Sequence, residues 1–370
     1  MAQRAPSSPF RAALDTLVPY EPGRPIELVR RELGLTGPVV KLASNEGQYG
    51  PFPAALEAIA RAAIEGNRYP DGGCHALRSA LAERHGLDLE QVVVGNGADA
   101  ILNYLALAVL EPGDEVAFCW PSFPVYPINA AKMGAVAVRA PLAGSAYDLE
   151  ALASVVTPRT KLVYVTNPNN PTGGMVGREA LAQFLDGLPE HVLPVIDEAY
   201  HEYVGDPDYP NALREHLVEG RRVVVLRTFS KIYGLAGLRV GWGAMPLDVS
   251  AALSKVKNAF DVSQPAQDAA RASIGDDAEI ARRAAETRAG RERLAAGLVE
   301  LGLSPLPAVG NFVSVEVGDG AALAGMLERL GVIVRPLGGF GDPTSVRISV
   351  GTPDEIETAL RALGEVRPSA

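Results

Sequence analysis

The sequence predicts an α/β protein with a large, mostly parallel sheet domain and a smaller C-terminal α/β domain. Apolar, β-rich runs alternate with helical patterns through the middle of the chain, as in parallel strands joined by crossover helices. The 370 residues, 47% of them hydrophobic, suffice for one large and one smaller core. After about Phe260 a long helix rich in Ala, Arg and Glu begins, and fewer strands follow it.

The order of elements follows from these patterns. In the large domain we expect strands at 91–94, 115–120, 135–139, 161–166, 192–197 and 223–228, and helices at 53–65, 99–110 and 178–188. The C-terminal part should hold a helix at 276–301, strands at 311–317, 332–336 and 345–350, and a helix from Pro353. We therefore expect an N-terminal arm and helix at 1–40 that pack with the small domain, a large domain at 41–260 and a small domain at 261–370.

The charge and the cysteines limit the possible partners. With 34 basic and 44 acidic residues, the net charge of −10 repels nucleic acid and anionic membrane surfaces. No apolar run approaches the length of a membrane span. Cys74 and Cys119 form no CxxC motif, and the five histidines form no cluster with acids, so we expect neither disulfides nor a metal. These features predict a cytoplasmic protein.

One lysine stands where an apolar strand ends. Lys231 follows the run VVVL within the segment RTFSKIYGLAGLR, which closes on Arg239. An isolated Ser-Lys pair usually lies on the surface, but a cofactor aldehyde needs an amine together with a phosphate anchor. The hydroxyls of Thr228 and Ser230 and the guanidinium of Arg239 would supply that anchor. The segment therefore indicates a site for a phosphorylated aldehyde cofactor.

A carboxylate and two neutral polar groups extend this interpretation. Asp197 ends an apolar run, at the strand end where open α/β sheets bind ligands, and could pair with the nitrogen of a pyridine ring. The amide of Asn170 and the phenol of Tyr200 could bind the ring oxygen. These segments also have other interpretations. Residues 166–173 fit an ordinary tight turn, and Asp197-Glu198 fits either a turn that ends a strand or the metal site of a nucleotide-binding protein. No GxxxxGK[ST] loop supports a nucleotide.

A glycine-rich turn opens a helix at residues 95–99. The backbone N–H groups of Ala98 and Asp99 could receive a phosphate there. The segment also loosely fits the dinucleotide-binding fingerprint, but the acidic residues near the next strand precede it instead of following it. Phe123 follows that strand and could stack on a cofactor ring, although a lone Phe at this place is more often in the core.

Together these segments resemble the fold-type I enzymes that depend on pyridoxal phosphate (PLP), and within them the histidinol-phosphate aminotransferase branch. The resemblance covers nearly the whole chain. It rests on short segments in the right order, namely PYEPG at 19–23, KLASNE at 41–46, RYPD at 68–71, GNGAD at 95–99, NPNNPTG at 167–173, DEAY at 197–200, the span from Ser230 to Arg239, and VRISVG at 346–351.

The resemblance implies a role for each site residue. Lys231, Asp197 and Tyr200 would be catalytic, with Lys231 joined to PLP as a Schiff base. The cofactor would be held by Ala98, Asp99, Phe123, Asn170, Asp197, Tyr200, Thr228, Ser230, Lys231 and Arg239. Tyr69 would reach the phosphate in the neighbouring subunit, which implies a homodimer with shared active sites. Tyr20, Asn45, Arg335 and Arg347 would bind substrate, the two arginines taking the substrate phosphate and the carboxylate of glutamate.

The implied reaction is transamination between histidinol phosphate and 2-oxoglutarate. An aromatic amino-acid aminotransferase shares every cofactor residue and is the nearest alternative, and a phosphothreonine decarboxylase is a more distant one. A transcription regulator on this fold would need a DNA-binding module before it, and only forty residues precede Lys41. Two departures from the family pattern stand out. Gly47-Gln48 replaces Asn-Pro in a loop expected to face substrate, and Ala100 replaces Glu beside the phosphate turn.

Overall fold

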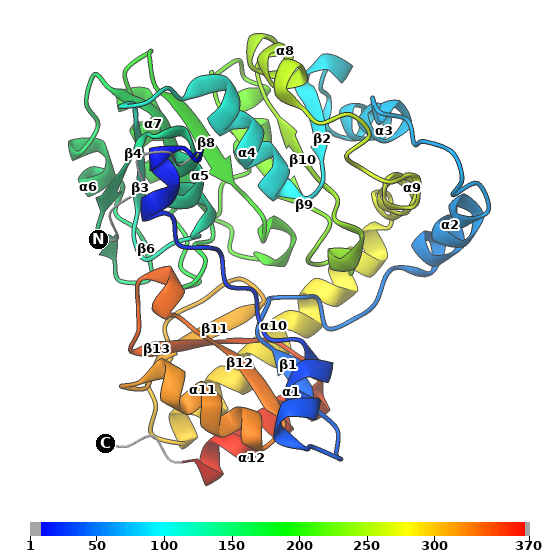
Figure 1. The fold of residues 1–370 in the computed structure, drawn as a ribbon, viewed down its shortest axis with the longest axis vertical. Helices are drawn as coiled ribbons and strands as arrows, with labels where there is room; N and C mark the ends of the chain where they lie inside the picture. Colours follow the sequence, from blue (N-terminus) through cyan, green and yellow to red (C-terminus); the bar gives the residue numbers. More distant parts are fainter. Residues whose placement is uncertain (1–8, 367–370) are drawn as a thin grey trace.

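A seven-stranded sheet forms the centre of the larger part of the molecule (Figure 1). The computed structural model describes residues 9–366. Across the sheet the strands run in the order β2 (Val92–Gly95), β10 (Gly241–Ala244), β9 (Val224–Thr228), β8 (Leu193–Asp197), β7 (Thr160–Thr166), β3 (Glu115–Cys119) and β4 (Val136–Ala140). Only β10 is antiparallel to its neighbours, so the sheet is mostly parallel as predicted.

Helices cover both faces of this sheet. Alternate strand residues point to opposite faces, so Val116 and Phe118 enter one apolar cluster and Ala117 and Cys119 the other. The first cluster is completed by α4 (Ala98–Val109), α5 (Val125–Met133) and α8 (Leu247–Val256). The second is completed by α2 (Pro53–Ala63), α3 (His75–His85), α6 (Leu149–Ser154), α7 (Arg178–Gly187) and α9 (Gln264–Ser273). Burial on both faces explains why these strands read as nearly continuous apolar runs.

A second sheet of four strands forms the smaller part. Its order is β1 (Val40–Leu42), β12 (Val332–Pro336), β13 (Ser345–Ser349) and β11 (Phe312–Glu316). It lies with α1 (Ile26–Leu33), α10 (Asp277–Glu300), α11 (Gly320–Arg329) and α12 (Pro353–Glu365), and α10 reaches back toward the large sheet (Figure 1). The short elements are η1 (Ala12–Thr16), η2 (Leu89–Gln91), β5 (Leu142–Ala143), β6 (Ala146–Tyr147), η3 (His201–Tyr203), η4 (Leu213–Leu217), η5 (Ala236–Leu238) and η6 (Gly338–Phe340).

One strand in each of the two sheets differs from the sequence expectation, and the short strands β5 and β6 were not expected either. The strand β10 reads GWGA, and glycine is depleted in strands, so the pattern gives no strand signal there. The strand β1 has only three residues and lies across the expected boundary at residue 40, paired with β12. The N-terminal segment also contacts both parts, because α1 packs on the small sheet through Val29 whereas η1 contacts α5.

The fold brings several polar segments to one edge of the large sheet. The parallel strands β7, β8 and β9 end at Thr166, Asp197 and Thr228, and these carboxyl ends face the small sheet. No helix between residues 9 and 366 is long and apolar enough to cross a membrane.

Candidate active site

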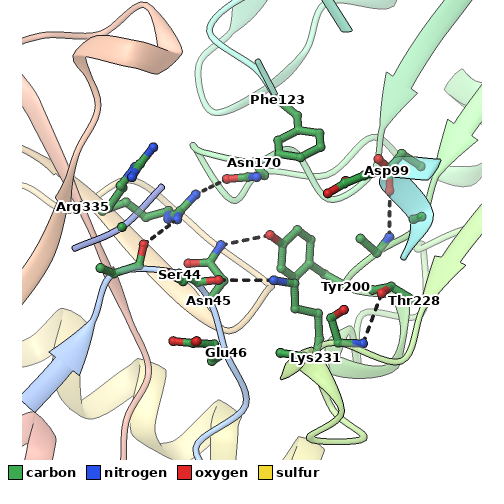
Figure 2. A pocket seen from close by; sticks show the side chains of 18 of the residues that line it. Ser44, Asn45, Glu46, Asp99, Phe123, Asn170, Tyr200, Thr228, Lys231 and Arg335 are labelled. Atoms are coloured by element: carbon green, nitrogen blue, oxygen red, sulfur yellow. Dashed lines mark hydrogen bonds between the residues drawn. The ribbon is translucent and has the colours of Figure 1, made fainter. Parts of the chain in front are cut away.

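A cavity of about 320 Å³ lies between the carboxyl edge of the large sheet and the small sheet. All of the site residues predicted from the sequence line it except Tyr69, namely Tyr20, Asn45, Ala98, Asp99, Phe123, Asn170, Asp197, Tyr200, Thr228, Ser230, Lys231, Arg239, Arg335 and Arg347. Its size and its few convergent polar groups are typical of a small-molecule site. Figure 2 shows that these side chains come from both parts of the molecule.

Lys231 points into the cavity from the segment that follows β9. Its Nζ donates a hydrogen bond to the Ser44 carbonyl at 3.3 Å and lies 5.7 Å from the centre of the Tyr200 ring. Burial, with a smaller contribution from the positive charge of Arg347, lowers the pKa of Lys231 to about 8. A substantial fraction of this amine is therefore neutral and nucleophilic near physiological pH.

Asp197 ends β8 at the floor of the cavity and is only 5% exposed. Its carboxylate accepts hydrogen bonds from the Tyr126 hydroxyl at 2.8 Å and from the Ala199 amide at 3.1 Å. Burial raises the pKa of Asp197 to about 6, against the lowering effect of these two bonds. A buried carboxylate that has no cationic partner in contact within residues 9–366 is suited to bind a ligand that brings a positive charge.

A phosphate-sized cradle lies beside the start of α4. Arg239 approaches Ser230 Oγ at 3.4 Å and the Asp99 carboxylate at 3.6 Å, and the Ser230 amide donates to Thr228 Oγ1 at 3.1 Å. Gly97 has a φ of 77°, and a Cβ there would lie 2.4 Å from the Arg239 guanidinium. The guanidinium can pack this closely on the turn only because residue 97 is glycine. A helix N-terminus, hydroxyl groups and a guanidinium thus converge on one anion site.

Asn170 and Tyr200 lie between this cradle and the small sheet. Arg347 Nη1 donates to Asn170 Oδ1, which leaves the Asn170 amide hydrogens to act as donors. The Tyr200 hydroxyl accepts a hydrogen bond from Asn45 Nδ2 at 2.9 Å. Phe123 also lines the cavity and meets the Tyr126 ring edge-on at 5.7 Å.

Two buried arginines reach the cavity from the small sheet. Arg347 on β13 and Arg335 on β12 are 4% and 8% exposed, and neither forms an ion pair with an acidic residue in the described part of the chain. Within the described residues, the two guanidiniums donate hydrogen bonds to backbone oxygens and to one amide oxygen, with Glu21 O at 2.6 Å from Arg335 and Ala43 O at 3.0 Å from Arg347. The Nε atom of Arg347 is buried without a hydrogen-bond partner within residues 9–366.

Burial lowers the pKa of Arg347 to about 10, so the group keeps its charge at neutral pH. The Phe340 ring lies beneath both guanidiniums, at 5.2 Å from Arg347 and 5.3 Å from Arg335. Buried cations without carboxylate partners are costly unless a ligand brings negative charge. These two arginines therefore indicate an anionic ligand on the small-sheet side of the cavity.

Tyr69 lies outside the cavity. Its side chain is 84% exposed and stacks on Phe260 with ring centres 4.7 Å apart. A role for Tyr69 in this cavity would have to be played in another subunit, as the family resemblance implies.

The altered loop at Gly47-Gln48 does not line the cavity, although it was expected to face substrate. A Cβ on Gly47 would lie 2.5 Å from the Lys231 carbonyl oxygen, so residue 47 packs against the backbone of the lysine segment. The Gln48 side chain accepts a hydrogen bond from Thr287 of α10 at 3.1 Å. Ala100 likewise lies outside the lining. Both departures from the family pattern therefore lie outside the cavity lining.

Several lining residues were not predicted from the sequence, among them Ser44, Glu46, Thr166 and Phe340. Tyr126 was also missed, since its hydroxyl reaches Asp197 from the helix α5 that follows Phe123. No motif assigns a role to Thr166, Phe340 or Tyr126, because they join the site through contacts between distant segments. The loop KLASNE, which includes Ser44 and Glu46, was the one usable signal.

Comparisons with known proteins agree with this geometry. The family model "Aminotransferase class I and II" matches residues 37–363. A histidinol-phosphate aminotransferase of Moorella thermoacetica is 43% identical over 96% of this chain and 92% of the relative. An aromatic amino acid aminotransferase of Thermobifida fusca is also 43% identical, over 97% of both chains.

The solved structures give the same result. The crystal structure of histidinol-phosphate aminotransferase from Sinorhizobium meliloti in complex with pyridoxal-5'-phosphate is similar to this chain with a TM-score of 0.86. The two are 31% identical over 97% of each chain. The prediction of the fold is confirmed by this match, and the chain belongs to the class I and II aminotransferase family.

Proposed function

We propose that this protein transfers the amino group of histidinol phosphate to 2-oxoglutarate with PLP held at Lys231. The observation that carries the substrate assignment is the pair of buried arginines, Arg335 and Arg347, which lack carboxylate partners among the described residues. Histidinol phosphate has a phosphate and no α-carboxylate, whereas 2-oxoglutarate has two carboxylates. Guanidinium groups bind both kinds of anion through paired hydrogen bonds.

The residues of the cavity fit PLP. The amine of Lys231, whose pKa is lowered, suits the aldehyde of this cofactor. The buried carboxylate of Asp197 suits the ring nitrogen, and the anion cradle at Arg239 suits the phosphate. When bound, PLP supplies the aldehyde that takes up the amino group and a protonated ring that withdraws electrons. The amide hydrogens of Asn170 and the hydroxyl of Tyr200 would hold the ring oxygen.

The chain's own groups would then divide the work. Asp197 would keep the ring nitrogen protonated, and Phe123 would fix the plane of the ring. Lys231, once released, would remove the proton from the amine-bearing carbon of the substrate and return a proton on the cofactor side, as general base and then general acid. The same residues would act in reverse on 2-oxoglutarate, which predicts ping-pong kinetics.

A side-by-side assay tests the substrate. Histidinol phosphate should be consumed with 2-oxoglutarate much faster than phenylalanine at equal concentration. R335Q should lower kcat/KM for histidinol phosphate by roughly 100-fold, the loss expected for one charge-assisted phosphate contact, and should affect phenylalanine less. Faster turnover of phenylalanine by the unmodified enzyme would replace this proposal with the alternative below.

The second candidate is an aromatic amino acid aminotransferase. It is favoured by one observation, the 43% identity to the Thermobifida fusca relative of that name, which equals the identity to the histidinol-phosphate relative above. For an aromatic amino acid, Arg347 would bind the α-carboxylate and Arg335 would have no anion to bind in the half-reaction with the amino donor. R335Q would then leave kcat/KM for the aromatic amino acid largely intact.

We also propose that the protein is a homodimer with shared active sites. The support is an exposed aromatic surface formed by Tyr69, which is 84% exposed, and Phe260, which is 48% exposed and stacks on it. Exposed apolar side chains gathered in this way commonly mark a protein interface. Tyr69 would extend from this surface to the PLP phosphate of the second subunit.

A further inference from the structure

Asn45 lies between the small sheet and the phenol of Tyr200, as Figure 2 shows. It is 1% exposed and has a φ of 53°, a left-handed conformation that asparagine adopts more readily than most residues. Its carbonyl oxygen accepts a hydrogen bond from Asn311 Nδ2 at 3.0 Å. The backbone of Asn45 is therefore held by the protein itself.

The hydrogen bonds around Asn45 fix which way its amide points. The Asn45 backbone amide donates to Ser349 Oγ at 2.8 Å, so this hydroxyl must direct its single hydrogen elsewhere. That hydrogen goes to the Asn45 side chain, 3.1 Å away, where only an oxygen can accept it. The NH₂ group is consequently the part that faces Tyr200.

This orientation in turn fixes the role of the Tyr200 hydroxyl. An amide NH₂ can only donate, so the phenol oxygen accepts the 2.9 Å bond from Asn45 Nδ2. No other hydrogen bond to this hydroxyl is found within residues 9–366. The hydrogen of Tyr200 remains available to a group inside the cavity, and a hydroxyl that accepts one bond is a stronger donor in the next.

We propose that Asn45, oriented by Ser349, is a positioning residue that makes Tyr200 a hydrogen-bond donor to the ring oxygen of PLP. This inference rests on the proposed cofactor site but not on the identity of the substrate. It differs from the substrate-binding role that the sequence resemblance implies for Asn45. Ser349 ends the strand that carries Arg347, so the small sheet supplies both an anion-binding group and the support of Tyr200.

The test is the pH transition in the visible absorption of the PLP-loaded enzyme, measured without substrate. Donation by Tyr200 favours negative charge on the ring oxygen, so weaker donation should raise the midpoint of this transition. We expect N45A to raise it by about 0.5 to 1 pH unit, the equivalent of one ordinary hydrogen bond. Y200F should raise it further.

The double variant separates positioning from other roles. If Asn45 acts through Tyr200, N45A should cause no additional shift in the Y200F background. S349A should shift the midpoint in the same direction as N45A while keeping the left-handed backbone of Asn45. S345A, at the other end of the same strand and away from the cavity lining, is the matched control and should leave the midpoint unchanged.

Four results would overturn the inference. One is an N45A enzyme with full cofactor content, an unchanged midpoint and a raised KM, which is the behaviour of a substrate ligand. Another is an equal shift from N45A in the wild-type and Y200F backgrounds. If N45A does not fold, an unchanged midpoint in S349A contradicts the proposal just as well. A wild-type enzyme that shows no cofactor absorption would instead overturn the PLP assignment, and this inference with it.

Discussion

The burial of Lys231 determines the pH at which its amine can react. Since the pKa of Lys231 is lowered to about 8, the rate at which the apoenzyme binds PLP covalently should rise with pH through a midpoint near 8. Stopped-flow absorption after mixing apoenzyme with PLP measures this rate. Free Nα-acetyl-lysine is the control and should show a midpoint near its ordinary pKa, about 10.4. A protein midpoint as high as that of the control would contradict the prediction.

Asp197 should reduce the stability of the cofactor-free protein. Its pKa in the folded state is about 6, above its ordinary value, so folding becomes less favourable as the pH rises from about 4 to about 6. D197N removes this cost. The D197N apoenzyme should be more stable than wild type at pH 7 by up to about 3 kcal/mol, at about 1.4 kcal/mol per pH unit, and nearly equal to it at pH 4.

Urea unfolding of both apoproteins at the two pH values checks this prediction. D197N should at the same time bind PLP more weakly and lose most of its activity, because the ring nitrogen no longer meets a carboxylate. Equal stability of wild type and D197N at pH 7 would show that the charged carboxylate of Asp197 does not destabilise the folded protein. The prediction describes a residue kept for chemistry at the expense of stability.

At the scale of elements, Gly97 in the turn before α4 can be compared with Gly113 in the turn between α4 and β3. Gly97 and Gly113 both have positive φ, but only Gly97 lies against a functional group, the Arg239 guanidinium. G97A and G113A should each cost about 1 kcal/mol of stability through backbone strain. Only G97A should also weaken PLP binding, by roughly tenfold, because the new methyl group displaces Arg239.

Fluorescence titration of the two apoproteins with PLP gives the comparison. Both variants place a methyl group on a residue of positive φ, and only G97A places it against Arg239, so a loss of PLP affinity confined to G97A reports on that contact. Equal PLP affinity in G97A and G113A would show that Arg239 does not need its present position to hold the phosphate.

The elements also show what the sequence could predict and what it could not. Lys231, Asp197 and Asn170 each follow an apolar strand, so their common place at one sheet edge follows from the alternation of strands and helices. The roles of Tyr126 and Ser349 depend on which distant side chain each hydroxyl meets, and no local pattern encodes that. The strand β10 was missed because its glycines permit close packing but give no strand signal.

At the scale of the whole molecule, the proposed dimer makes a prediction about mixed subunits. If each site combines Lys231 of one subunit with Tyr69 of the other, K231A should be inactive and Y69A should bind PLP poorly. When the two variants are unfolded together and refolded at equal amounts, half of the dimers are mixed, and one site in each mixed dimer is intact. Activity should therefore recover to about one quarter of the wild-type value.

The control for this experiment is each variant refolded alone, which should show no recovery. K231A mixed with the surface variant R361A should recover only what the R361A subunits contribute by themselves, since Arg361 lies on the exposed side of α12. If mixing Y69A with K231A gives no more activity than the separate variants, Tyr69 does not complete a site in the second subunit.

The packing of Gly47 against the lysine segment matters to anyone who wishes to redesign this enzyme. Position 47 differs from the family pattern and is therefore an obvious target for mutagenesis. However, a Cβ at this position would lie 2.5 Å from the Lys231 carbonyl oxygen and 3.8 Å from the Tyr203 hydroxyl. Larger residues there would disturb the lysine before they met a substrate. Substitutions meant to change the substrate are better made at Tyr20, Phe123 and Phe340, because these side chains line the cavity where a new substrate would have to fit.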